Sequence, residues 1–192
     1  MDEKTVASGT VRILMDAAEE VIGTNGLKAL LNFAMMSSLI EDRPGYGFEK
    51  AYTDIEYARI IVSFYELLGV PGAKAVFRVI GKAIAKHATN LGLFDSFKGL
   101  PPRERLFKAI ELYTMASGRG TALIEGDTVV YDNDACTTCY NIKSDVAICT
   151  ILNGFLDSMA AWAGLMGVRT VETQCKAAGA ATCRYEILPL GK

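Results

Sequence analysis

The chain has 192 residues, of which 51% are hydrophobic, and a formal net charge of −2. This length and composition predict a single globular domain over residues 1–192 and exclude a disordered chain. The small net charge gives no reason to expect nucleic-acid binding. The N-terminus is polar, unlike a secretory signal, and polar residues interrupt the most apolar stretch, residues 146–168. We therefore expect a cytoplasmic protein without a membrane span.

The first part of the chain, residues 1–117, is predicted to be helical. Gly23 and Gly69 are expected to end helices, and Pro and two glycines predict a loop at residues 41–48. Apolar residues at helical spacing predict helices at residues 11–22, 26–40, 54–68, 73–91 and 102–117.

The second part, residues 118–192, is predicted to contain a sheet and one long helix. Gly126-Asp127 lies between two β-prone runs within residues 121–131, which is typical of a hairpin. Residues 143–165 again predict a helix, and residues 168–173 and 184–188 predict a second hairpin. This order of elements indicates an α+β fold, with a small antiparallel sheet packed against several helices.

All five cysteines follow residue 135, and a reducing compartment favours metal binding for clustered thiols. Cys175 and Cys183 each lie four residues from Gly179, so a turn there would place their Cβ atoms about 5 Å apart. Glu172 precedes Cys175 by three residues, which in a regular strand would send the two side chains to opposite faces. We therefore predict that the strand bulges or ends between them. Cys149 lies near the start of the long helix that should cover this sheet.

Three thiolates and a carboxylate form a complete tetrahedral ligand set for zinc. A closed set leaves no site for an activated water, so the ion would be structural and would join the helix to the hairpin. Lys176 and Arg184 could offset part of the negative charge of such a site. Spacing alone leaves two alternatives open, a disulfide and a pair of reduced buried thiols.

The pattern Glu172-x2-Cys175-x3-Gly179-x3-Cys183, with Cys149 upstream, resembles the 4-vinyl-reductase-like, or hydrocarbon-binding, domain family. The resemblance covers about residues 118–187. It implies a fold related to the zinc-containing aromatic-sensing domains of phenol-responsive activators, to TRAPP small subunits and to nitric-oxide-signalling ligand-binding domains. It also implies a structural zinc at these residues, a homodimer, and a small hydrophobic ligand in an enclosed apolar pocket, without catalysis. Phenol itself is not expected, because no histidine lies near Val129 or Val130, where the sensors contact its hydroxyl.

Five residues are candidates for contact with such a ligand. His87 is the only histidine and points to the apolar side of its predicted helix, where a satisfied core residue is the alternative. Phe155 and Trp162 share one face of the long helix and would equally serve as ordinary core residues. Tyr113 and Val130 complete the set.

Cys136 and Cys139 form a CxxC pair in the loop after residue 131 and lie outside the family pattern. The pair could be a second metal half-site, a redox pair, or two unreactive thiols in a partly covered loop.

Three functions follow from these observations. The first is a sensory domain that binds a small hydrophobic molecule and is stabilised by zinc. The second is an enzyme or accessory protein of the 4-vinyl-reductase kind in tetrapyrrole or related cofactor metabolism, although no Gly-rich dinucleotide fingerprint is present. The third is a tether-like interaction protein, which rests on analogy of fold alone.

Overall fold

The structure is a computed structural model that describes residues 5–190. Its helices and strands alternate along the chain, with most of the sheet in the C-terminal part. In chain order they are β1 (Thr5–Ala7), α1 (Ser8–Phe33), α2 (Ser38–Glu41), β2 (Lys50–Thr53), α3 (Asp54–Asn90), the short 3-10 helix η1 (Asp95–Phe97), α4 (Pro102–Ser117), β3 (Thr121–Glu125), β4 (Thr128–Asn133), α5 (Thr150–Ala163), β5 (Val168–Gln174), the 3-10 helix η2 (Lys176–Ala178) and β6 (Cys183–Pro189).

The larger sheet has four antiparallel strands in the order β3-β4-β6-β5. Gly126 and Asp127 form the turn of the first hairpin, as predicted, because Glu125 pairs with Thr128. The register of β5 against β6 shifts between Glu172 and Gln174. This irregularity confirms the predicted bulge between Glu172 and Cys175, and it changes which side chains of β5 face the helices.

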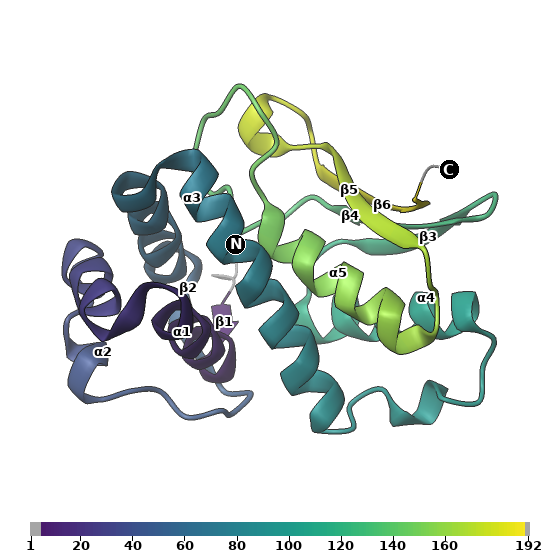
Figure 1. The fold of residues 1–192 in the computed structure, drawn as a ribbon, viewed down its shortest axis with the longest axis horizontal. Helices are drawn as coiled ribbons and strands as arrows, with labels where there is room; N and C mark the ends of the chain where they lie inside the picture. The colour runs from purple at the N-terminus through teal and green to yellow at the C-terminus, as the bar shows by residue number, and fades with distance from the viewer. Residues whose placement is uncertain (1–4, 191–192) are drawn as a thin grey trace.

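Helix α5 lies between the sheet and α3 (Figure 1). One apolar core joins α4 and α5 to the inner face of the sheet, and a second joins α1 to α3. Ile151 of α5 belongs to the second core. Helix α5 is therefore the element through which the helical part and the sheet are packed together.

Helices α3 and α5 approach each other closely at two glycines. A Cβ atom added to Gly154 would overlap the carbonyl group of Arg78, and one added to Gly81 would overlap that of Ile151. Both clashes are with backbone, which cannot rotate away as a side chain can.

We predict that Gly154→Ala lowers the free energy of unfolding by about 1–3 kcal/mol, the usual cost of overpacking. For a chain of this size that corresponds to a melting temperature about 2–12 °C lower, measurable by circular dichroism. Gly99→Ala is the matched control, since a Cβ there would meet nothing within 4 Å. Equal melting temperatures for the two variants would contradict the close packing of α3 and α5.

Two predicted helix ends are confirmed as breaks inside longer helices. Gly23 has φ 74° within α1 and Gly69 has φ 65° within α3. Among the described residues, α3 is the one helix whose length and composition would allow it to cross a membrane. Because α3 is broken at Gly69 and packs against α1 and α5, we interpret it as a core helix.

Two local predictions differ from the structure, and one strand pair was not predicted. Helix α5 begins at Thr150 and not at residue 143, because the preceding residues form a loop in which the Ser144 N–H donates to the Ala177 carbonyl at 2.9 Å. The helix predicted to reach residue 40 ends at Phe33. Strands β1 and β2 pair with each other but were not predicted, since strands this short leave no periodic pattern.

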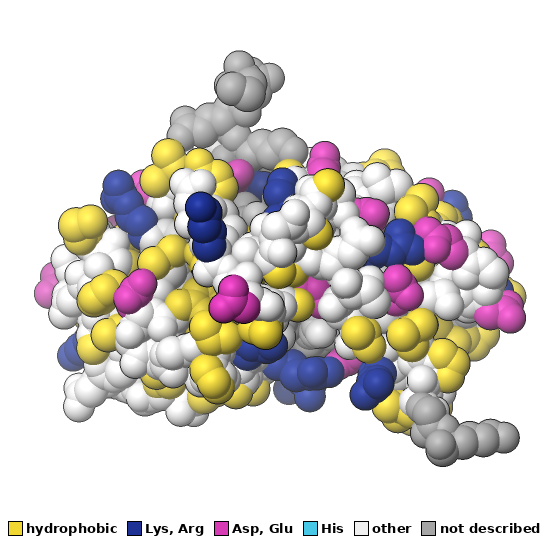
Figure 2. All heavy atoms as spheres, turned by 90° about the horizontal axis from the view of Figure 1, so that it is seen from above, with side chains coloured by type: hydrophobic (Ala, Val, Ile, Leu, Met, Phe, Trp, Pro, Cys, Tyr) yellow, Lys and Arg dark blue, Asp and Glu magenta, His cyan; other side chains and the backbone are white. Residues whose placement is uncertain are grey.

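The face of the molecule drawn in Figure 2 carries side chains of both charge signs. Figure 2 shows basic and acidic side chains interspersed with small groups of hydrophobic ones over one face. This distribution agrees with the small formal net charge of −2.

Candidate metal centre

The four predicted zinc ligands meet at one point. Cys149, Glu172, Cys175 and Cys183 each offer a ligand atom, and these atoms lie within 4.8 Å of one another. The Sγ atom of Cys149 lies 3.9 Å from that of Cys175 and 3.8 Å from that of Cys183. With Zn–S bonds of about 2.3 Å, two thiolates of a tetrahedral zinc site are about 3.8 Å apart. These two sulfur distances are therefore compatible with a zinc site.

Cys149 is positioned by the segment that leads into α5, where it occupies the N-cap. The Lys74 ammonium donates to the Ala147 carbonyl and the Thr150 hydroxyl donates to the Lys74 carbonyl, both at 2.8 Å. The Tyr185 hydroxyl donates to the carbonyl of Cys149 itself at 3.4 Å. Cys149 is thus held between α3 and β6, at the N-terminus of α5.

Cys175 and Cys183 are brought together by the turn between β5 and β6. Gly179 lies in this turn with φ 93°, a conformation that glycine adopts without strain. The backbone N–H of Lys176 donates to the Cys183 sulfur at 3.3 Å. Such a bond orients the sulfur, as outer-shell partners of metal ligands do.

Glu172 has one carboxylate oxygen in use and one without a partner. Its Oε2 accepts the backbone N–H of Cys149 at 2.9 Å. Its Oε1 is buried and has no hydrogen-bond partner. Burial, together with the neighbouring Cys175 thiol, raises the pKa of Glu172 to about 9. A cation would satisfy a buried, unpaired oxygen of a carboxylate that lies beside three thiols, so this donor set fits zinc.

The thiols also alter one another's acidity. The Cys136 thiol beside Cys149 raises the pKa of Cys149. Hydrogen bonds from Cys139 and Cys149 lower the pKa of Cys175. Thiols that share protons in this way can release them to a divalent ion, which binds only deprotonated ligands.

Arg184 does not offset the charge of this site, contrary to the prediction. Because Cys183 faces the helices, its neighbour Arg184 faces the other side of the sheet, where it pairs with Glu125 and Glu186. The Lys176 ammonium donates to the Asp134 carbonyl at the edge of the cluster.

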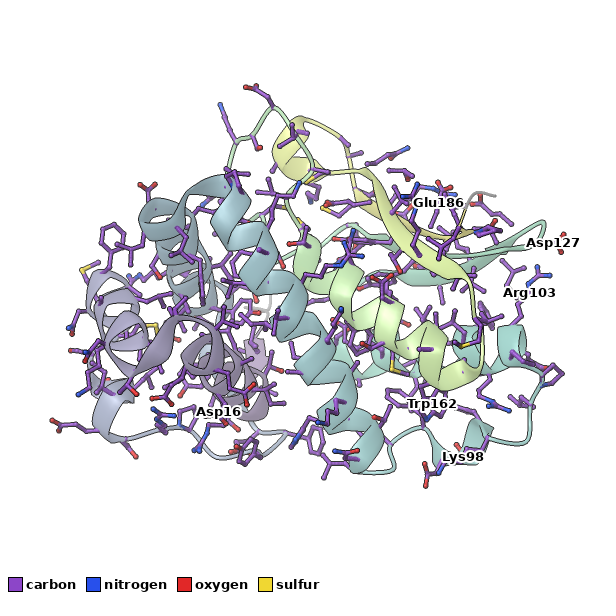
Figure 3. The ribbon with its side chains drawn as sticks, viewed as in Figure 1. Asp16, Lys98, Arg103, Asp127, Trp162 and Glu186 are labelled. Atoms are coloured by element: carbon purple, nitrogen blue, oxygen red, sulfur yellow. The ribbon has the colours of Figure 1, made fainter. Side chains whose placement is uncertain are left out.

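Cys136 and Cys139 join the same cluster, which their separate position in the sequence did not indicate. The Cys136 sulfur lies 3.5 Å from that of Cys149, and the Cys139 sulfur lies 3.5 Å from that of Cys183. Both side chains are buried. In Figure 3 the sulfur atoms gather where the β4–α5 loop, the start of α5 and the η2 turn meet. The available signals were the crowding of all five cysteines after residue 135 and the CxxC spacing of this pair, which is that of a metal half-site.

The five predicted ligand-contact residues do not form one group, although two of them are in contact. Tyr113 packs against Phe155, with 4.8 Å between ring centroids. Val130 lies between two residues that face the helices, so its own side chain points to the opposite face of the sheet.

The other two residues lie elsewhere. Trp162 contacts Phe94 near the far end of α5, away from the thiols (Figure 3). His87 stacks on Tyr46 at 5.1 Å between ring centroids. Both residues lie on the helices predicted from the sequence. The sequence could not predict their contacts, because the direction of each side chain depends on its packing partners.

Two clefts flank the cluster within the described part of the chain, and none of the five predicted ligand-contact residues lines either. The first, of about 370 Å³, lies beside Glu172 and is lined by polar and basic residues that include Lys74, Arg78 and Arg169. The second, of about 570 Å³, is lined by Cys136 and Cys139 together with Asp54, Ala135, Thr137, Tyr140, Asn141, Ile142, Lys143 and Lys176.

The fold defined by these elements is the α+β class predicted from the sequence, of the type found in nitric-oxide-signalling ligand-binding domains. The chain is similar to a double variant of the Tt H-NOX protein, with TM-score 0.59 and 15% identity over 97% of each chain. It is also similar to an H-NOX protein from S. oneidensis in the Fe(II)NO ligation state, with TM-score 0.54 and 16% identity over 93% of this chain and 98% of that one. A triple mutant of an H-NOX protein from S. oneidensis in the Fe(II) state gives TM-score 0.56 and 14% identity over 94% and 96%.

These neighbours correct the family predicted from the motif. The structures that match are H-NOX proteins, not 4-vinyl-reductase-like domains or TRAPP subunits, so that prediction is wrong. A short Glu-Cys-Gly-Cys spacing reports a local hairpin, which unrelated chains can share. No family model matches the sequence, and no curated protein does. At this level of identity the likeness shows the fold alone.

Proposed function

We propose that this protein is a zinc-stabilised sensory domain that binds a small ligand. The convergence of Cys149, Glu172, Cys175 and Cys183 carries the zinc part of the proposal, together with the buried, unpaired Oε1 of Glu172. The fold likeness to H-NOX proteins supports the ligand-binding part, since one of these neighbours is in the Fe(II)NO ligation state. Elemental analysis of protein purified without added metal tests the first part, and a zinc content near zero would refute it.

Glu172→Gln tests two separate effects of this residue, its effect on the stability of the metal-free protein and its contribution to zinc binding. In metal-free protein the folded pKa of about 9 exceeds the ordinary 4.5. This group therefore stabilises the fold fully below pH 4.5, and that stability is lost as the pH rises toward 9. We expect metal-free wild type to lose stability relative to metal-free Glu172→Gln over this range. With zinc bound, we expect the wild type to be more stable than Glu172→Gln. Glutamine removes a zinc ligand and should weaken zinc binding at least about tenfold.

Urea unfolding of both proteins at several pH values, with and without a chelator, measures this prediction. If the difference in stability between the variant and the wild type were the same with and without chelator, Glu172 would be excluded from the zinc site.

The ligand class in this proposal is a small hydrophobic molecule, and the aromatic residues beside α5 are its proposed location. Tyr113 contacts Phe155 and Tyr131, and Tyr131 stacks on Tyr185 at 5.9 Å between centroids. Tyr185 in turn donates to the carbonyl of Cys149. A ligand that bound between Tyr113 and Phe155 would displace the first members of a continuous row of contacting rings. Because this row ends at the metal site, ligand binding would be coupled to the metal site.

Native mass spectrometry of protein purified from cell extract tests this ligand. The expected result is a bound apolar molecule that Tyr113→Ala loses and that Met115→Ala, a change at an exposed position on the same helix, retains. Retention of the molecule by Tyr113→Ala would place the ligand elsewhere.

An iron cofactor held by histidine, as in many haem proteins, does not fit this chain. His87 is the only histidine, and its ring is stacked on Tyr46. Neither of the two clefts next to the cluster is lined by it. The proposal therefore takes a small ligand, but no histidine-bound iron, from the likeness to H-NOX proteins.

The tetrapyrrole enzyme and the tether-like protein lose their basis with the family resemblance on which they rested. The predicted homodimer and cytoplasmic location belong to the present proposal. Sedimentation equilibrium tests the former, and a monomer at micromolar concentration would refute it.

A further inference from the structure

We propose that the cluster holds two zinc ions that share the sulfurs of Cys149 and Cys183. This inference deepens the proposed function and rests on it, since it adds a second ion beside the one bound with Glu172 and Cys175. The second ion would be bound by Cys136, Cys139, Cys149 and Cys183.

The geometry provides two complete ligand sets with one common edge. Cys136, Cys139, Cys149 and Cys183 have their sulfurs within 4.8 Å of one another, as do the four ligand atoms of the first set. The common edge, from the Cys149 sulfur to that of Cys183, is 3.8 Å long. Six ligands with two of them shared supply four donors to each of two ions. Zinc modules of the Zn2Cys6 type likewise use six protein ligands for two ions.

The loop at residues 134–149 is the second argument for another ion. Loops longer than about 12–15 residues without secondary structure are uncommon in compact domains unless they serve a function. Cys136 and Cys139 are nevertheless only 6% and 5% exposed. A metal ion bound to both residues would fasten this loop to β6 through Cys183 and to α5 through Cys149.

Charge favours two ions over one once the ligands are deprotonated. Five thiolates and a carboxylate carry six negative charges, of which a single divalent ion offsets two and a pair offsets four. An uncompensated buried charge is costly. Two nearby cations are held by other groups, since the Lys176 ammonium bonds the Asp134 carbonyl and the Arg119 guanidinium pairs with Asp54.

The two ions should differ in accessibility. The cleft of about 570 Å³ is lined by Cys136 and Cys139 but by none of the other four ligands. The ion bound to this pair is therefore the one that a chelator should reach first, and the ion bound with Glu172 should leave later.

Native mass spectrometry of the full chain, loaded with zinc alone, tests the proposal. We expect two zinc ions in the wild type, one in Cys136→Ser/Cys139→Ser, and one in Glu172→Gln/Cys175→Ser. Thr137→Ala, within the same loop, is the control and should keep two. Because a variant could fail to fold, the wild type is also titrated with chelator, and the loss of zinc should pass through a species with one ion.

Each outcome distinguishes the two proposals. One ion in both the wild type and Cys136→Ser/Cys139→Ser would overturn the second ion and leave the proposed function intact. If the wild type held one ion and Cys136→Ser/Cys139→Ser held none, the single ion would be bound by the loop cysteines. That result would overturn both the site that includes Glu172 and the proposal of two ions. A wild type without zinc would refute the proposed function itself.

Discussion

Cys183→Ser is expected to empty the cluster of zinc and to lower the melting temperature by about 8–16 °C. Cys183 belongs to both ligand sets, so its loss leaves neither complete. Zinc present at a thousandfold excess over its dissociation constant stabilises the folded state by about 4 kcal/mol. In a chain of this size each kcal/mol corresponds to about 2–4 °C. The effect is large because Cys183 belongs to both ligand sets, which together join three separate segments, the loop, the start of α5 and the β5–β6 hairpin.

The measurement combines zinc content with thermal unfolding, in the presence and absence of a chelator. With chelator the wild type should melt within a few degrees of Cys183→Ser, because serine replaces a buried thiol of similar size. A difference of the same size in both conditions would mean that Cys183 stabilises the core by packing alone. That result would contradict the metal site while leaving the fold unchanged.

The position of the first ligand set could be predicted because its geometry is local. The symmetry of Cys175 and Cys183 about Gly179 defines a hairpin, and the odd spacing of Glu172 requires the bulge that β5 contains. Both inferences use only strand periodicity over twelve residues of chain. Cys149 was harder, since its place depended on the packing of a predicted helix onto the sheet.

The parts that could not be predicted depend on contacts between distant segments. Cys136 and Cys139 lie in a loop with no periodic pattern, so nothing local indicated that their sulfurs approach Cys149 and Cys183. Val130 was placed on the correct strand but on the wrong face for a pocket beside α5, because a shift of one residue reverses the direction of a side chain. The family resemblance failed for a related reason. The spacing of the residues Glu172, Cys175, Gly179 and Cys183 describes one hairpin and not the fold of the whole chain.

The second large effect is expected at Asp54, which pairs with a nearly buried arginine. The Arg119 side chain is 8% exposed, and its guanidinium donates to Asp54 Oδ2 at 3.1 Å and to the Ala135 carbonyl at 3.0 Å. These bonds connect the first turn of α3, the start of β3 and the loop next to Cys136. Asp54 also lies where a negative charge favours the N-terminus of α3.

Asp54→Ala is expected to lower the free energy of unfolding by about 3 kcal/mol, because it leaves the buried guanidinium without its counter-charge. The corresponding fall in melting temperature is about 6–12 °C. Lys108→Ala, which removes an exposed ion pair with Glu111, is the control and should cost at most about 1 kcal/mol.

The double variant Asp54→Ala/Arg119→Met tests the cause, since methionine fills the space without charge. If the penalty comes from the unpaired guanidinium, this variant should be more stable than Asp54→Ala alone. If it is less stable, the bond from Arg119 to the Ala135 carbonyl contributes more than the charge costs. The loop that carries Cys136 would then depend on Arg119 for its position, and zinc binding by the double variant should weaken in parallel with its stability.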